Sequence, residues 1–425
     1  METWIEIFLE LRDKLAGSQE LKKREKKLKK RILETLDEKE KRTLLRKLKN
    51  MRAERKQREQ RVGILMGAGM ALVLLLVVGL SVGKVISVQR AKAEAQAAAE
   101  QAEQERIARE QKEEEERIAR ENTPVELTFT FTGDCTLASD IAFDEDTSFT
   151  SYYDVYGADY FFKNFRSLFE ADDVTVVNME GTLSDVEEAY REPKEYAFKA
   201  PRAYSAILSG SSVEAANLAN NHSQDYGEIS YTDTIDELEG KGIKTFGYDE
   251  VAVIEVKGIK VGLLGIYELR DHLERKPQIK ANIQKLKDQG CQYIAACFHW
   301  SNELVTDPDE YQIELGHYAI DEGADIVIGH HPHVVQGMEE YKGKTIAYSL
   351  GNFCFGGNVN PTEKDAMVLQ QKVTLVKGEI TEQQNTVIPI SVSSNSSYND
   401  YQPRILDGDD ADRVMNKISE RRPYY

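Results

Sequence analysis

Cysteine is scarce in this chain, which has four of them among 425 residues. So few thiols exclude a fold held together by a dense set of disulfide bridges. Cys291 and Cys297 stand on either side of one strand-like run, a poor geometry for a bridge. A bridge between Cys135 and Cys354 is conceivable because both follow predicted strand ends. A buried free thiol or, for Cys135, a soft metal ligand are the alternatives.

Charge is absent from Val62 to Gly83, a run of 22 residues. A helix of this length rises about 33 Å, enough to cross the apolar core of a bilayer. The run begins some sixty residues into the chain, is too long for the apolar part of a signal peptide and is followed by no persuasive small-residue cleavage site, which argues against a cleaved signal peptide. We therefore predict a single transmembrane signal-anchor helix over residues 62–86.

Net positive charge is confined to residues 1–61, which hold 21 Lys+Arg and 12 Asp+Glu; the remainder holds 34 and 61. A basic block directly before an apolar span stays in the cytoplasm. We therefore predict a cell-membrane protein whose N-terminus is cytoplasmic and whose C-terminal part is extracellular. Nucleic-acid binding is the alternative for the block, but acids are interspersed through it, which favours a solvated helical segment without a nucleic-acid partner.

Apolar residues recur at helical spacing within this basic segment. They are Trp4, Phe8, Leu11 and Leu15, and then Leu21, Leu28, Ile32 and Leu36. The pattern predicts helices whose apolar faces pair with another chain or lie on the inner leaflet of the membrane.

Glycine and proline are missing from Arg90 to Glu121, and the hexamer Glu-Arg-Ile-Ala-Arg-Glu occurs there twice, eleven residues apart. Eleven residues are close to three helical turns, so both copies present the same face. We predict a charged helical stalk over residues 87–122, roughly 45–50 Å long. The period suits a coiled coil, but the apolar stripe of Ile107, Ile118 and alanines is thin, so we interpret the segment as a spacer.

Strand-like and helix-like runs alternate after the stalk, which predicts an α/β layered domain over residues 123–395. The strand-like runs are Leu127–Thr132, Val174–Asn178, Val213–Ala219, Val261–Gly265, Tyr293–Phe298, Ile326–Ile328 and Thr345–Leu350. Helix-like runs cover 231–241, 277–289 and 311–322. Residues 396–425 are expected to form a C-terminal tail, with a short helix over 408–421.

Polar residues follow six of these strand-like runs. They are Gly133-Asp134, Asn178-Met-Glu180, Asn220-Asn221-His222 with Asp225, His299-Trp300-Ser-Asn-Glu303, His330-His331-Pro-His333 and Ser349-Leu-Gly-Asn352. In α/β folds, ligands bind at the carboxyl ends of strands. Because three of the seven histidines lie within four positions, we predict a metal site; a merely polar loop is the alternative.

These motifs and their order, from Leu127 to Val392, resemble the CapA family of capsule-synthesis proteins. That family is associated with poly-γ-glutamate, and its domain is similar to the calcineurin-like metallophosphoesterases. The resemblance implies sheets flanked by helices on a membrane anchor.

The resemblance also implies roles for particular residues. The implied metal ligands are Asp134, Glu180, Asn221, His299, His331 and His333, with Asp134 and His222 as catalytic residues and His222 as general acid. Asn178, Trp300, Glu303, His330 and Asn352 are implied as pocket or ligand-orienting residues. Oxygen and nitrogen ligands suit one or two ions of Mn, Fe or Zn. The chain departs from the phosphoesterase pattern in one place, since Cys135 and Thr136 follow Asp134 where that pattern has Asp-x-His.

Two functions remain open. One is a metal-dependent hydrolase or transferase in the synthesis or export of an anionic surface polymer such as poly-γ-glutamate. The other is a non-catalytic accessory protein that binds polymer beside membrane synthase subunits. A net charge of −27 beyond residue 61 repels a polyanion, so contact needs metals or a basic patch. Lys194, Lys199 and Arg202 are candidates for that patch, with a solvated loop as the alternative.

Overall fold

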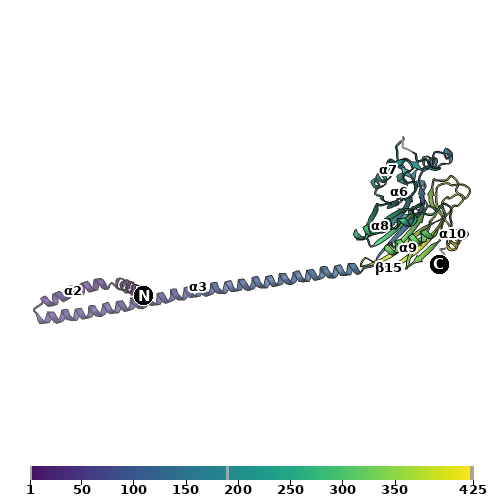
Figure 1. The fold of residues 1–425 in the computed structure, drawn as a ribbon. Coiled ribbons are helices and arrows are strands. Elements are labelled where there is room, and N and C mark those ends of the chain that lie inside the picture. The colour runs from purple at the N-terminus through teal and green to yellow at the C-terminus, as the bar shows by residue number, and fades with distance from the viewer. Residues whose placement is uncertain (1, 188–190, 422–425) are drawn as a thin grey trace. The chain divides into compact units, whose positions relative to one another are not determined.

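A computed structural model describes residues 2–187 and 191–421 (Figure 1). The chain forms two compact units, Met1–Glu115 and Glu116–Tyr425. The helices are α1 (Glu2–Leu15), α2 (Ser18–Glu34), α3 (Glu38–Asn122), α4 (Phe149–Tyr156), α5 (Arg166–Phe169), α6 (Ala206–Ser209), α7 (Gly227–Gly240), α8 (Lys276–Asp288), α9 (Glu310–Glu322) and α10 (Gly408–Glu420).

The strands all lie in the second unit. They are β1 (Val125–Thr136), β2 (Val174–Met179), β3 (Thr182–Leu183), β4 (Lys199–Ala200), β5 (Ala215–Asn217), β6 (Lys244–Phe246), β7 (Val251–Val256), β8 (Ile259–Tyr267), β9 (Tyr293–His299), β10 (Ile326–His330), β11 (Met338–Tyr341), β12 (Lys344–Ala347), β13 (Asn352–Phe355), β14 (Asp365–Val376), β15 (Glu379–Ser391) and β16 (Arg404–Ile405).

In the first unit, α2 packs against the beginning of α3. Ile32 of α2 and Leu44 and Leu48 of α3 are buried in a small apolar cluster. Glu25 of α2 lies 2.8 Å from the Nε of Arg55 on α3, so the apolar contact is extended by an ion pair. The basic segment thus forms a helical hairpin.

The predicted anchor and stalk are parts of one uninterrupted helix, α3. Among the described residues, α3 is the one helix that is long and apolar enough to cross a membrane. Its apolar side chains are exposed, Leu65 for example by 71%. Toward its end, Arg106–Glu110 and Arg109–Glu113 pairs, one helical turn apart, contribute a few tenths of a kcal/mol each.

The second unit contains two large sheets and a small two-stranded sheet of β3 and β4. The first has the order β16-β15-β14-β1-β2-β5-β6, with β13 also paired to β1, and the second has the order β11-β12-β10-β9-β8-β7. β9 shows why they stack: Tyr293, Ala295 and Cys297 enter the core between the sheets, whereas Ile294, Ala296 and Phe298 enter the outer core. This period of two gives the strand two apolar faces.

Helices cover the outer faces of the sheets. α8 and α9 contact the second sheet through β8 and β10, and α7 contacts β6 of the first sheet and β3 of the two-stranded sheet (Figure 1). Between the sheets, the rings of Phe129 and Tyr293 stack with centroids 4.2 Å apart. The predicted α/β class, with sheets flanked by helices, is therefore confirmed.

The predicted C-terminal tail is part of the domain rather than an appendage. β16 pairs with β15, and Val414 and Ile418 of α10 are buried in the core between the sheets. The Ser/Asn-rich segment before β16 is a loop that forms hydrogen bonds within itself. Asp400 accepts hydrogen bonds from the Ser393 hydroxyl and from the Ser394 amide. The last four residues of the predicted tail, 422–425, lie outside the described residues.

Parallel pairing explains where the site forms. β1, β2, β5 and β6 pair in parallel, as do β8, β9, β10 and β12. Their carboxyl ends therefore meet at one edge of the stacked sheets.

Glycine is required at that edge because strands approach closely there. A Cβ on Gly329 would lie 1.9 Å from the carbonyl oxygen of Tyr348, and one on Gly133 would lie 2.1 Å from that of Gly351. The glycines before Asp134 and His330 thus allow the strands to bring these side chains together.

At the opposite, amino ends of β2 and β5, two carboxyl groups share a half-buried position. Burial raises the pKa of Glu214 to about 7 and that of Asp172 to about 6, and the nearby Asp172 carboxylate also raises the pKa of Glu214. The Thr175 amide donates to Glu214 at 2.8 Å, an interaction that a glutamine oxygen preserves.

We expect Glu214→Gln to stabilise the second unit at pH 8 but not at pH 4.5. A carboxyl group with a raised folded-state pKa stabilises the fold below its unfolded pKa, and that contribution is lost as the pH rises through the folded value. For a half-buried group the gain at pH 8 is about 1–2 kcal/mol. Thermal unfolding at both pH values measures it, with the exposed Glu170→Gln as control. An equal effect of Glu214→Gln at the two pH values would contradict the expectation.

Candidate functional site

The polar strand ends predicted from the sequence converge on one site. Asp134 on β1 pairs in register with Asn178 on β2 and with Asn352 on β13, and His299 on β9 pairs with His330 on β10. The sheets therefore place residues from distant parts of the chain side by side.

Glu180, directly after β2, lies at the centre of the imidazoles. Its Oε1 is 3.7 Å from Nε2 of His299 and 3.9 Å from Nε2 of both His222 and His333. Asp134 lies beside this group, with its carboxylate oxygens 3.3 Å from Nδ1 of His333 and 3.4 Å from Nδ1 of His330.

The Glu180 carboxylate is completely buried, and neither oxygen has a hydrogen-bond partner among the described residues. Burial raises the pKa of Glu180 well above its ordinary value; the nearby Asp134 raises it further and His333 opposes the shift. An unpaired buried carboxylate is costly unless a proton or a cation neutralises it. The residues here therefore fit a cation.

Suitable ligand atoms surround that position. Glu180, His331 and His333 each offer one atom, and these atoms all lie within 4.8 Å of one another. Burial lowers the pKa of His331 to about 3, so its imidazole is neutral and free to bind a metal. Burial also lowers the pKa of His333, but Glu180 and Asp134 outweigh this and raise it to about 10, so here a metal would compete with a proton.

The other three predicted ligands lie next to this triad. His299 is buried, which lowers its pKa well below the ordinary value, and its Nε2 is 2.6 Å from Oδ1 of Asn221. Burial raises the pKa of Asp134, but hydrogen bonds from His330 and His333 dominate and hold it well below its usual range. Asp134 is therefore an anion.

Asn178 connects two of the predicted ligands. Its Nδ2 donates to Oδ1 of Asp134 at 2.7 Å and lies 3.3 Å from Nδ1 of His299. Asn217 on the neighbouring strand donates to Oδ1 of Asn178 at 2.9 Å and so fixes its orientation. The sequence reasoning missed Asn217; an asparagine inside a buried apolar run was the available signal.

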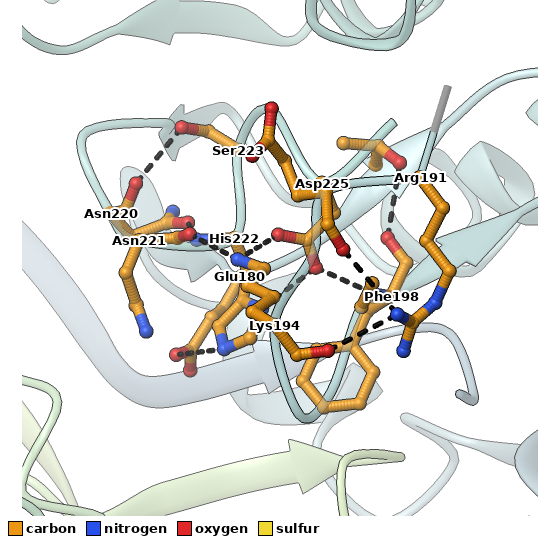
Figure 2. A network of polar contacts seen from close by, with 12 residues as sticks. Glu180, Arg191, Lys194, Phe198, Asn220, Asn221, His222, Ser223 and Asp225 are labelled. Atoms are coloured by element: carbon orange, nitrogen blue, oxygen red, sulfur yellow. Dashed lines mark hydrogen bonds and ion pairs between the residues drawn. The ribbon is translucent and has the colours of Figure 1, made fainter. Parts of the chain in front are cut away.

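His222 belongs to a second network, shown in Figure 2. Its Nδ1 lies 2.7 Å from Asp225, whose carboxylate also accepts the Phe198 amide and pairs with Lys194. Lys194 donates to the carbonyl oxygen of Asn221 at 2.6 Å. Both are therefore site residues: Asp225 had no role assigned from the sequence, and Lys194 was there a candidate only for a basic patch.

This network determines what His222 can do. Burial lowers the pKa of His222, and Asp225 opposes that shift. With Nδ1–H directed at Asp225, the Nε2 atom faces Glu180 and is the atom that accepts or returns a proton. The general-acid role therefore requires prior protonation of Nε2.

We expect Asp225→Asn to lower the pKa of His222 by about one unit or more, because the variant loses the carboxylate that favours the imidazolium. NMR titration of the metal-free protein measures this, with the His222 signal assigned from its absence in His222→Gln. Asp159→Asn, at an exposed carboxylate, is the control. An unchanged His222 pKa in Asp225→Asn would show that the carboxylate does not act on the imidazole.

Three predictions about individual residues need correction. Trp300 does not line the pocket: it is fully buried in the outer core, and its Nε1 donates to the carbonyl of Tyr348 at 2.8 Å. Lys199 and Arg202 form no basic patch with Lys194, since Lys199 donates to the Val186 carbonyl and Arg202 pairs with acids of α7. The positions of these three side chains follow from the packing of the strands and helices that carry them, which the sequence pattern does not show.

The bridge between Cys135 and Cys354 is absent, since both thiols are free and buried. Burial raises the pKa of Cys135 to about 12, which disfavours the thiolate that a metal would need. Thr136, in place of the phosphoesterase histidine, has a buried hydroxyl without a hydrogen-bond partner in the described part of the chain.

A cavity of about 250 Å³ opens at His222 and His333. Its walls include Glu303 and Asn352, and also four aromatic rings and a second carboxylate: Phe143, Tyr196, Phe198, Phe355 and Glu363. None of the described residues that line it is a lysine or arginine. Asn352 Oδ1 lies 2.9 Å from Nδ1 of His333 and so orients that imidazole.

Two curated bacterial proteins are similar to this chain in sequence. PGA biosynthesis protein CapA of Bacillus subtilis (strain 168) is 27% identical over 231 residues, which cover 50% of this chain and 61% of that protein. Capsule biosynthesis protein CapA of Bacillus anthracis is 29% identical over 237 residues, covering 50% and 58%. The chain thus matches about three fifths of the length of these relatives.

A solved structure of a phosphatase from Mycoplasma pneumoniae is similar with a TM-score of 0.39 and 14% identity, covering 63% of this chain and 95% of that one. The sequence profile of the bacterial capsule synthesis protein family PGA_cap matches residues 128–357, which hold every site residue named above except Glu363. Because this match covers more than half of the chain, the protein belongs to the bacterial capsule synthesis family PGA_cap.

Proposed function

We propose that this protein acts in the synthesis or export of an anionic cell-surface polymer, poly-γ-glutamate or a similar one, through a metal-dependent site of the hydrolase or transferase type. The observation that carries the proposal is the buried Glu180 carboxylate, which accepts no hydrogen bond from any described residue and is surrounded by imidazoles. The CapA relatives, which are named for PGA and capsule biosynthesis, suggest the biological process.

The proposed ligands are Glu180, His331 and His333, joined by Asp134, Asn221 and His299 for one or two divalent ions of Mn, Fe or Zn. When bound, such an ion supplies Lewis acidity that polarises an acyl or phosphoryl oxygen. His222, held by Asp225, moves a proton at Nε2, and Asn178 and Asn352 orient Asp134 and His333.

The charge of the cavity limits how polymer can bind. Glu303 and Glu363 make its wall acidic, and no lysine or arginine is among the described residues that line it, so away from His333 and the metal position a polyanion meets no cationic side chain there. We infer that only the single reacting group enters the metal site, while the rest of an anionic polymer remains outside.

We further propose that residues 62–86 anchor the protein as a single-pass membrane protein. Residues 1–61 would then be cytoplasmic, residues 87–122 would form the extracellular stalk, and the domain from residue 123 would lie outside the cell. The support is the charge-free run within α3 and the basic block before it.

A non-catalytic accessory role beside membrane synthase subunits is the second candidate. Thr136 favours it, because a buried hydroxyl without a partner stands where a second metal of the phosphoesterase type would have a histidine ligand. With that ligand lost, the site would hold polymer rather than cleave it.

Elemental analysis of the purified full-length protein after mild dialysis tests the proposal. One or two equivalents of a transition metal support the metal-dependent site, and assays with phosphoester and amide substrates then separate catalysis from binding. A folded protein that contains no metal and takes up none would overturn the metal-dependent function and leave the accessory role.

A further inference from the structure

The N-terminal helix α1 has an apolar face that is open to its surroundings. Trp4, Leu11 and Leu15 lie on one side of the helix and are 76%, 48% and 63% exposed. The acidic residues Glu2, Glu6, Glu10 and Asp13 occupy the opposite side. Large exposed apolar side chains on one face of a helix indicate a surface that contacts protein or lipid.

The position of α1 indicates what covers its apolar face. α1 lies against α3 at the point where the charge-free run begins: Cδ of Arg12 is 3.5 Å from where a Cβ on Gly63 would lie. Phe8 and Arg12 line one hollow together with Gly63 and Ile64 of α3. Since Gly63 has no side chain, the two helices can approach closely at this level.

The exposed apolar surface of α1 therefore adjoins that of the predicted span. Ile64 and Leu65 are 72% and 71% exposed, and the apolar run continues from them along α3. A second copy of the chain on α1 would leave this adjoining surface of the span uncovered, whereas a lipid layer covers both at once.

The charge of the first unit agrees with a lipid surface. Residues 16–61 hold 19 Lys+Arg and 8 Asp+Glu, so the hairpin that carries α1 is strongly basic. Asp13 at the end of α1 is paired with Lys22 of α2 at 3.0 Å, which ties the helix to that hairpin. Basic segments next to a span are attracted to the anionic lipids of the inner leaflet.

We propose that α1 lies in the headgroup region of the cytoplasmic leaflet, with the face of Trp4, Leu11 and Leu15 toward the acyl chains. The inference rests on the proposed membrane span and goes beyond it, because a span alone leaves α1 in water. α1 then fixes the depth of α3 in the membrane, as an interfacial tryptophan anchor does.

Trp4 provides the test, because the chain has two tryptophans and the other, Trp300, is buried in the second unit. Full-length protein is placed in nanodiscs of phosphatidylcholine and phosphatidylglycerol that carry bromine at shallow or deep acyl positions. The fluorescence of native protein minus that of Trp4→Phe isolates Trp4. We expect stronger quenching by shallow than by deep bromines, and weak quenching by aqueous iodide. Strong iodide quenching would show that Trp4 lies in water and would overturn the proposal. Protection of Trp4 from both bromine and iodide would indicate a contact with protein and would also overturn it.

Two further variants separate this inference from the anchor. Trp4→Phe combined with Leu72→Trp reports on the span, and deep-bromine quenching of the new tryptophan confirms that the span is inserted. If that signal is present while Trp4 is not quenched by bromine, the α1 inference fails and the anchor stands. Leu11→Ser with Leu15→Ser should reduce Trp4 quenching about twofold, whereas the control Glu6→Ser with Glu10→Ser, on the opposite face, should not.

Discussion

Replacement of both His331 and His333 by alanine is expected to reduce the metal content of the protein to background while the fold persists. The two imidazoles are two of the three side chains whose ligand atoms lie within 4.8 Å of one another, so the variant leaves Glu180 alone in that group. Both residues lie in the loop after β10, outside the apolar cores. Elemental analysis measures the metal, and circular dichroism measures the fold.

The variant should also be less stable than the native protein in the absence of metal. His333 lies 3.3 Å from Asp134, and its loss leaves that buried carboxylate with less compensation. His272→Ala is a suitable control, because His272 is exposed and belongs to the same unit. If the double variant retained its metal, Glu180, His331 and His333 would not be the ligands.

Glu180→Gln is expected to change the stability of the protein in opposite directions with and without metal. Without metal and at a pH above the raised folded-state pKa of Glu180, the substitution removes a buried charge that has no hydrogen-bond partner among the described residues, so the free energy of unfolding should rise by several kcal/mol. With metal, it removes a ligand, and the stabilisation that metal binding adds to the native protein is largely lost.

The pH dependence of stability predicts the same direction of change for metal-free Glu180→Gln. The pKa of Glu180 is raised by burial, so its contribution to stability is complete below the unfolded value and is lost as the pH rises through the folded one. Metal-free native protein should therefore lose stability toward alkaline pH relative to Glu180→Gln. Thermal unfolding of both proteins, with and without Mn²⁺ or Zn²⁺, measures the effect. A variant stabilised by metal as much as the native protein would remove Glu180 from the ligand set.

Much of the fold follows from local pattern. Tyr293–Phe298 alternates between two apolar faces, and this period of two predicts a strand buried on both sides, as β9 is. The predicted helices over 277–289 and 311–322 correspond to α8 and α9 within one or two residues. The long hairpin of β14 and β15 was not predicted, because much of β15 is polar and exposed and its pairing with β14 cannot be read from its own residues.

The candidate site was predictable as a set of residues but not as a geometry. Polar groups that follow apolar runs can be recognised in the sequence, as for Asp134, Glu180, His299 and His333. The pairing of Asp225 with Lys194 depends instead on a loop that returns to the site from β3.

The sequence by itself determined the charge-free run, its basic flank and the polar residues at the strand ends, because each depends only on neighbours along the chain. The tertiary structure alone decided that Glu180 lacks a donor, that Trp300 is turned into the outer core and that α1 reaches the start of the apolar run. These depend on which strands and helices become neighbours. Pairing Asp134 with both Asn178 and Asn352 brings together residues that are distant in the chain, and only the packing of the sheets specifies that meeting.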